Sequence, residues 1–166
     1  MTDAGITVLL FYGHILSAIA WLGSGILTTF VVGPGARSMS PAAGLEFNAK
    51  VMPRILRFIQ AAIGSTFLFG VLLFFYLGVD AASSGARVLD GGIVVALVTA
   101  ALVFSVTVPS FRKVIRMSQE RIASGVQGPP PPDMMKYGRR ARMGSMAAVA
   151  LLLVVVLLMV TSAVAY

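Results

Sequence analysis

Cysteine is absent from this sequence, and histidine occurs once, at position 14. The missing cysteine excludes disulfides, thiolate metal sites, cysteine nucleophiles and covalent haem attachment through a C-x-x-C-H motif. Acidic residues are also few, with six Asp and Glu against 13 Lys and Arg. All six lie outside the long apolar stretches or at their edges, which argues against a proton-relay transporter. Motifs typical of soluble enzymes, such as a glycine-rich phosphate loop, do not occur.

Apolar residues dominate instead, at 58% of the chain against 11% charged residues, with a mean hydropathy of +0.92. This composition lies outside the range of soluble globular domains. The apolar residues form four stretches long enough to cross a bilayer as helices, at residues 6–32, 54–79, 92–116 and 143–165. We therefore predict one membrane domain over residues 1–166, an all-α protein folded as an antiparallel four-transmembrane-helix bundle.

Prolines and glycines indicate where the spans begin and end. Gly33-Pro34-Gly35 is predicted to end the first span, because proline cannot continue the helical hydrogen-bond ladder. Pro53 stands at a helix start, where proline is tolerated. The third span is expected to lead past Pro109 into an amphipathic basic stretch that ends near Ala123. Residues 117–142 form the Pro-rich basic connection to the fourth span.

Basic residues are distributed very unevenly between the connections. Lys and Arg are retained on the cytoplasmic side during membrane insertion. Twelve of the 13 fall beside the first and third connections, and Arg87 alone lies in the second. Both ends of the chain are therefore predicted to be non-cytoplasmic in a multi-pass protein of the cell membrane. The basic surface favours anionic membrane lipids as partners, and we do not expect nucleic-acid binding.

His14 is the most notable polar group inside a predicted span, in its outer half. A neutral imidazole in hydrocarbon needs a hydrogen-bond partner or a metal. Ala18, Trp21 and Gly25 follow at offsets of four, seven and eleven, so this helix face would admit a flat macrocycle bound to His14. In the alternative interpretation, the small residues let helices approach closely, and His14 hydrogen-bonds a carbonyl or hydroxyl group on a neighbouring helix.

The pattern His14-x6-Trp21-x-Gly23 resembles the first helix of a known membrane group. This group includes HemJ-type protoporphyrinogen oxidases and copper-resistance protein D membrane domains. The resemblance implies a haem b with His14 as axial ligand to the iron. The HemJ pattern has a basic residue late in the first span, where this chain has Thr28, Thr29 and Phe30. Because a mid-membrane lysine is also missing from the third span, protoporphyrinogen oxidase activity is not expected.

A haem on His14 leaves the sixth iron position to be filled, and three possibilities stay open. Met159 lies near the level of His14 in the fourth span and would give a His/Met site, although methionine is also common filler in apolar helices. Two protomers would otherwise share a haem through two copies of His14. In the third case the position is open to a small ligand.

Arg54, Arg57 and Gln60 form a second candidate site, at three-residue steps along the cytoplasmic end of the second span. Guanidinium groups in this arrangement would bind an anion such as a lipid phosphate or a quinone headgroup. The alternative is that these arginines snorkel to the interface and anchor the helix.

The function predicted from these features is that of an integral membrane b-type haem-binding protein. It would act in electron transfer or in haem handling or sensing, as a homo-oligomer or within a larger membrane complex. One alternative is an accessory structural subunit of a respiratory or oxidase complex, with His14 in a packing role. Another is copper or other metal transport, which the copper-resistance relatives and nine methionines suggest. If the chain is an enzyme, it is a redox-active membrane cytochrome.

Overall fold

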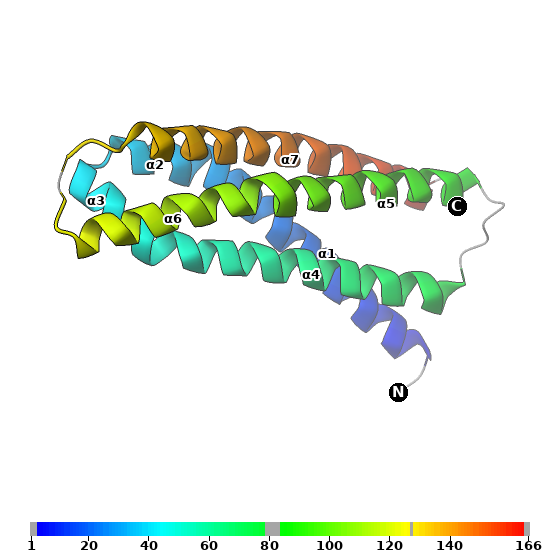
Figure 1. The fold of residues 1–166 in the computed structure, drawn as a ribbon. Coiled ribbons are helices and arrows are strands. Elements are labelled where there is room, and N and C mark those ends of the chain that lie inside the picture. Colours follow the sequence, from blue (N-terminus) through cyan, green and yellow to red (C-terminus); the bar gives the residue numbers. More distant parts are fainter. Residues whose placement is uncertain (1–2, 79–83, 127, 165–166) are drawn as a thin grey trace.

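The computed structural model describes residues 3–78, 84–126 and 128–164, and these contain helices and no strand. The α-helices, drawn in Figure 1, are α1 (Asp3–Leu27), α2 (Gly33–Ser38), α3 (Pro41–Glu46), α4 (Met52–Leu77), α5 (Ser84–Leu102), α6 (Val108–Ala123) and α7 (Pro132–Val164). Short π-helical turns connect several of them, namely η1 (Thr28–Val32), η2 (Phe47–Val51) and η3 (Val103–Thr107).

These elements merge into four long helices that are apolar enough to cross a membrane, judged by length and composition. They cover Ala4–Ser38, Pro41–Leu77, Gly85–Ala123 and Pro132–Val164. The prediction of an all-α chain with four helices long and apolar enough to span a membrane is confirmed. The helices extend beyond the predicted spans. Helix α5 begins at Ser84, before the predicted start at residue 92, and α7 begins at Pro132, inside the predicted connection over residues 117–142. The predicted span ends at residues 79 and 165 lie outside the described residues.

The first long helix does not end at Gly33-Pro34-Gly35, so that prediction was wrong. Instead, η1 widens the helix by one residue per turn, and the Gly33 N–H donates to the Thr28 carbonyl, five residues back. Pro34 then occupies the first turn of α2. A proline ring inside a regular α-helix clashes with the carbonyl four residues earlier and removes a donor. The wider turn puts the proline ring and its missing N–H group at the start of a new α-helical segment, where neither disrupts the hydrogen bonds, so the helix continues.

The same device precedes two other prolines in the described residues. Each time, a π turn closes with a backbone bond to the residue five positions back, and proline follows in the next helical turn. The pairs are Met52 with Phe47 before Pro53, and Val108 with Val103 before Pro109. The predicted continuation past Pro109 to Ala123 is confirmed, as α5, η3 and α6 form one long helix.

The long helices associate in two pairs, with α1 packed along α4 and α5 packed along α7. The pairs contact each other mainly through α6, which packs against α3, η2 and α4, and through the contact of α1 with α7. Figure 1 shows the first turn of α1 and the last turn of α7 toward the same end of the molecule, where α4 and α5 diverge.

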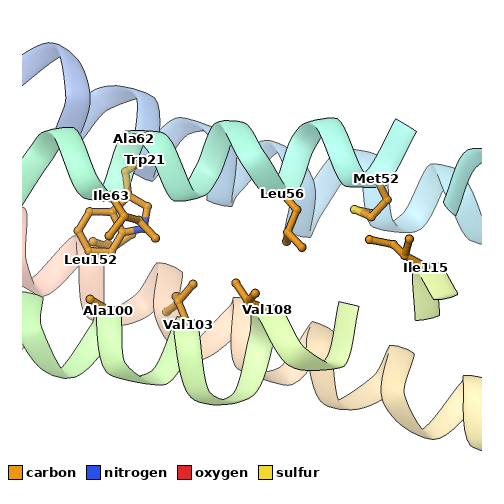
Figure 2. Packing of buried hydrophobic residues seen from close by; sticks show 11 residues of the cluster. Trp21, Met52, Leu56, Ala62, Ile63, Ala100, Val103, Val108, Ile115 and Leu152 are labelled. Carbon is orange, nitrogen blue, oxygen red and sulfur yellow. The ribbon is translucent and has the colours of Figure 1, made fainter. Parts of the chain in front are cut away.

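The main core lies between these pairs and receives side chains from all four long helices. Figure 2 shows its buried members, with Trp21 of α1 beside Ala62 and Ile63 of α4 and Leu152 of α7. A smaller core of Leu45, Val114 and Met134 joins α3, α6 and α7, at the end of the molecule that carries most of the basic residues. The main core joins α4 to α6 through Leu56 and Ile115, and the smaller core joins α6 to α3 and α7.

Candidate functional site

The imidazole of His14 lies at the interface of α1 and α4. Its Nδ1 is 3.0 Å from the backbone carbonyl oxygen of Thr66, on α4. Because a carbonyl oxygen only accepts hydrogen bonds, Nδ1 carries the proton of the neutral ring, and Nε2 keeps its lone pair. The Thr66 hydroxyl group donates separately to the Ala62 carbonyl, at 2.8 Å. The hydrogen bond to a carbonyl that the packing alternative expected is therefore present, and it leaves Nε2 able to bind a metal.

Two glycines let α1 and α4 approach closely around His14. A Cβ atom added to Gly70 would lie 2.9 Å from Cε1 and 3.0 Å from Nδ1 of His14. A Cβ atom on the adjacent Gly13 would lie 2.6 Å from the ring of Phe69. Small residues at helix crossings are the usual means of close packing in membranes, where lipid and side chains are equally apolar. Gly70 therefore provides the space in which the imidazole is held.

The face of α1 that follows His14 is largely packed against protein. Ala18 is half-buried. Trp21 is only 3% exposed, and its ring centroid lies 5.9 Å from that of Phe67 on α4. A Cβ atom on Gly25 would lie 3.2 Å from Cγ2 of Val149, so Gly25 marks the crossing of α1 with α7. The predicted face of α1 is thus packed against α4 at Trp21 and against α7 at Gly25.

A small cavity of about 40 Å³ adjoins Trp21 and Gly25 in the interior. Its polar lining comes from hydroxyl groups on three helices, namely Thr28, Thr107 and Ser145. The Thr107 hydroxyl oxygen is buried without a hydrogen-bond partner in the described residues. A few water molecules would fit, but pockets that enclose cofactor-sized ligands measure roughly 300–1,000 Å³. Sequence reasoning missed this group, because isolated Ser and Thr in apolar helices look like ordinary small packing residues.

Gly144 of α7 supports this region, and it offers a direct test of the packing. A Cβ atom there would lie 2.5 Å from the Thr107 hydroxyl oxygen. We expect Gly144→Ala to lower the free energy of unfolding by about 1–3 kcal/mol, since η3 and α7 must move apart. Thermal unfolding in detergent measures this change.

Gly138→Ala is the matched control on the same helix, because a Cβ atom at Gly138 would meet no heavy atom within 4 Å. Thr107→Ala should relieve most of the cost of Gly144→Ala. Equal effects of the two glycine substitutions would contradict the close contact between Gly144 and Thr107.

Met159, the residue predicted as a sixth iron ligand, packs on α5. A Cβ atom on Gly92 would lie 3.2 Å from Cε and 3.6 Å from Sδ of Met159. No contact described in the structure joins Met159 to His14. In addition, the described residues contain no group of three or more His, Asp or Glu side chains that could hold a metal ion. Of the two predicted iron ligands, His14 is held by a hydrogen bond to a neighbouring helix, whereas Met159 packs against Gly92.

The predicted arginine set is divided by the structure. The Arg54 guanidinium donates from Nη1 to the Lys50 carbonyl, at 3.1 Å on the exposed surface. Arg57 and Gln60 instead line a groove between α4 and α6. Sequence reasoning did not find the α6 residues of this groove, because nothing in the spacing along α4 indicates which helix packs beside it.

Comparisons with protein families, characterised proteins and solved structures find no match to this chain. The resemblance of the first helix to HemJ-type and copper-resistance protein D membrane proteins therefore stays a prediction from the residues around His14.

Proposed function

We propose that this chain is a membrane protein that binds haem b through Nε2 of His14. The observation that supports this most is the hydrogen bond from Nδ1 of His14 to the Thr66 carbonyl. Histidines that bind metals almost always donate their other ring N–H to a carbonyl or carboxylate, which fixes the ring and raises its basicity. Thr66 and Gly70 would thus orient the ligand, Thr66 by accepting the bond and Gly70 by leaving space for the ring.

His14 is the residue that would hold the haem iron in this proposal. Haem bound through a single histidine would provide one-electron exchange or binding of a small ligand. The chain's own part is to hold the imidazole in the required tautomer and to exclude water around it with apolar helices. These properties favour electron transfer or haem sensing over group-transfer chemistry.

The orientation in the membrane is part of the same proposal. Nearly all of the basic residues belong to α2, α6, the start of α4, the start of α7 and the segments between them. By the preference of Lys and Arg for the cytoplasmic side, we infer an antiparallel bundle with both chain ends non-cytoplasmic. His14, nearer the N-terminal end of α1, would then lie in the outer half of the bilayer, and bound haem would exchange electrons on that side.

An absorption spectrum of the purified protein tests the proposal directly. Protein from haem-replete cells should show a Soret band that shifts on reduction with dithionite. A colourless preparation from such cells would contradict haem binding.

The same geometry supports a second candidate, an accessory subunit of a larger membrane complex. The bond to Thr66 satisfies His14 without any cofactor and ties α1 to α4. Apolar side chains on the remaining faces of α1 stay exposed and available to lipid or to partner helices, including Leu9, Ile15, Leu16 and Ile19. A colourless protein that copurifies with stoichiometric partners in mild detergent would favour this function over haem binding.

A further inference from the structure

A groove of about 240 Å³ lies between α4 and α6, at the end of the molecule that carries most of the basic residues. Its floor is apolar and firm, because Leu56 and Ile115 are members of the main core and are only 5% and 8% exposed. Five long polar side chains from both helices surround this floor, namely Arg57, Gln60, Arg112, Arg116 and Gln119. The groove is therefore built by the packing of two helices and is separate from the region around His14.

The charge of the groove is of one sign. Three guanidinium groups line it, and no carboxylate does. Arg116 pairs with Glu120 at 3.4 Å, but both side chains are about two-thirds exposed or more, so this pair is weak. Arg57 and Arg112 form no ion pair or side-chain hydrogen bond within the described residues. Both side chains are exposed, so their guanidinium groups are free to bind an external anion.

The donors in the groove match a phosphate group. Guanidinium is planar and binds phosphate or carboxylate oxygens through two parallel N–H bonds. Gln60 adds amide donors on α4. On α6, the Gln119 amide donates one N–H to the Ala49 carbonyl, at 3.5 Å, and has a second N–H left. The volume is below the roughly 300–1,000 Å³ of pockets that enclose a drug-sized molecule. The groove therefore suits a compact anionic group better than a whole nucleotide.

The position of the groove along the helices indicates where this phosphate comes from. After Gln60, α4 carries no charged residue up to its end at Leu77. The chain is likewise uncharged from Ile93 up to Arg112. The groove thus lies where the charged parts of both helices meet their long uncharged parts, which would be the level at which the helices enter the hydrocarbon. An amphiphile with its phosphate between the arginines would have apolar surface beside it for its acyl chains.

We propose that the α4–α6 groove binds the phosphate group of an anionic membrane lipid, with Arg57 and Arg112 as the principal contacts. Native mass spectrometry of the full chain in detergent, titrated with phosphatidylglycerol, tests this. Arg57→Gln combined with Arg112→Gln should weaken lipid binding about tenfold, the loss expected for charge-assisted hydrogen bonds to one group. Arg57→Lys combined with Arg112→Lys should give an intermediate loss, because charge is kept while two-point contact is lost.

The matched control is Arg139→Gln combined with Arg140→Gln, which removes the same charge from exposed positions of α7 outside the groove. This variant should bind phosphatidylglycerol as the parent chain does. An equal loss in both glutamine pairs would reduce the effect to net charge and overturn the site. Equal binding of phosphatidylcholine would also overturn it, and displacement of the lipid by millimolar inorganic phosphate would assign the groove to a soluble anion instead. Unchanged thermal unfolding of the variants shows that the fold is kept.

Discussion

We expect His14→Ala to abolish the Soret absorption of the purified protein. The chain has no other histidine and no cysteine, so no equivalent donor replaces the lost Nε2. The variant should be colourless while keeping its helical circular dichroism, because His14 lies outside the main core. Addition of free imidazole should restore part of the absorption, since the substitution leaves a space the size of the ring.

Thr66→Val is the matched control for this experiment. The bond to His14 uses the backbone carbonyl of Thr66, and the hydroxyl group that valine removes donates only to Ala62. Thr66→Val should therefore retain the full Soret band. A band of normal intensity in His14→Ala would mean that any haem is held elsewhere, and the proposed ligand would be wrong.

Gly70→Leu is expected to lower the stability of the protein more than Gly144→Ala or His14→Ala. Its first side-chain atom alone would lie within 3.0 Å of the imidazole, and the remaining atoms need space that α1 occupies. Overpacking of this kind costs about 1–3 kcal/mol and occasionally more, and here it also breaks the bond between His14 and Thr66. We expect a loss of about 3 kcal/mol or more in the free energy of unfolding, measured by thermal unfolding in detergent.

Gly64→Leu provides the comparison within the same helix. Gly64 is exposed, and a Cβ atom there would meet nothing within 4 Å, so leucine at this position should be tolerated or stabilising. The cost of Gly70→Leu should fall in the His14→Ala background, because the two substitutions act on one contact and are not additive. If the costs of His14→Ala and Gly70→Leu simply add, the contact between the ring and Gly70 is not the cause.

The long helices could be predicted from sequence because uninterrupted apolar stretches have few other uses. The side chains that pack inside were harder to assign. Trp21 and Gly25 share a helix face with His14 by spacing alone, yet they contact Phe67 and Val149, which lie far apart in the sequence. Partners of this kind depend on how helices cross, and lipid-facing and protein-facing residues are equally apolar in a membrane.

Only part of the candidate anion site could be predicted from the sequence, for the same reason. Arg57 and Gln60 were found because polar residues stand out in an apolar helix. Arg112 belongs to a different helix, and its place opposite Arg57 follows only from the packing of α4 against α6. Arg54, which has the same three-residue spacing, instead donates a hydrogen bond to the Lys50 carbonyl. Regular spacing therefore identified the helix that takes part, while tertiary packing chose the residues.

The π turns also change the angular phase of the helices that contain them. Each residue of an α-helix advances by roughly 100° about the axis, so one additional residue in a turn rotates everything beyond it by about that angle. A helical wheel drawn through Thr28–Val32 or Val103–Thr107 thus assigns later side chains to a wrong direction. The helix made of α5, η3 and α6 has an apolar half before η3 and a basic half after it. The rotation at η3 changes the direction in which the side chains of α6 point relative to those of α5. The basic half can then turn its arginines toward α4 without twisting the packed contact between α5 and α7.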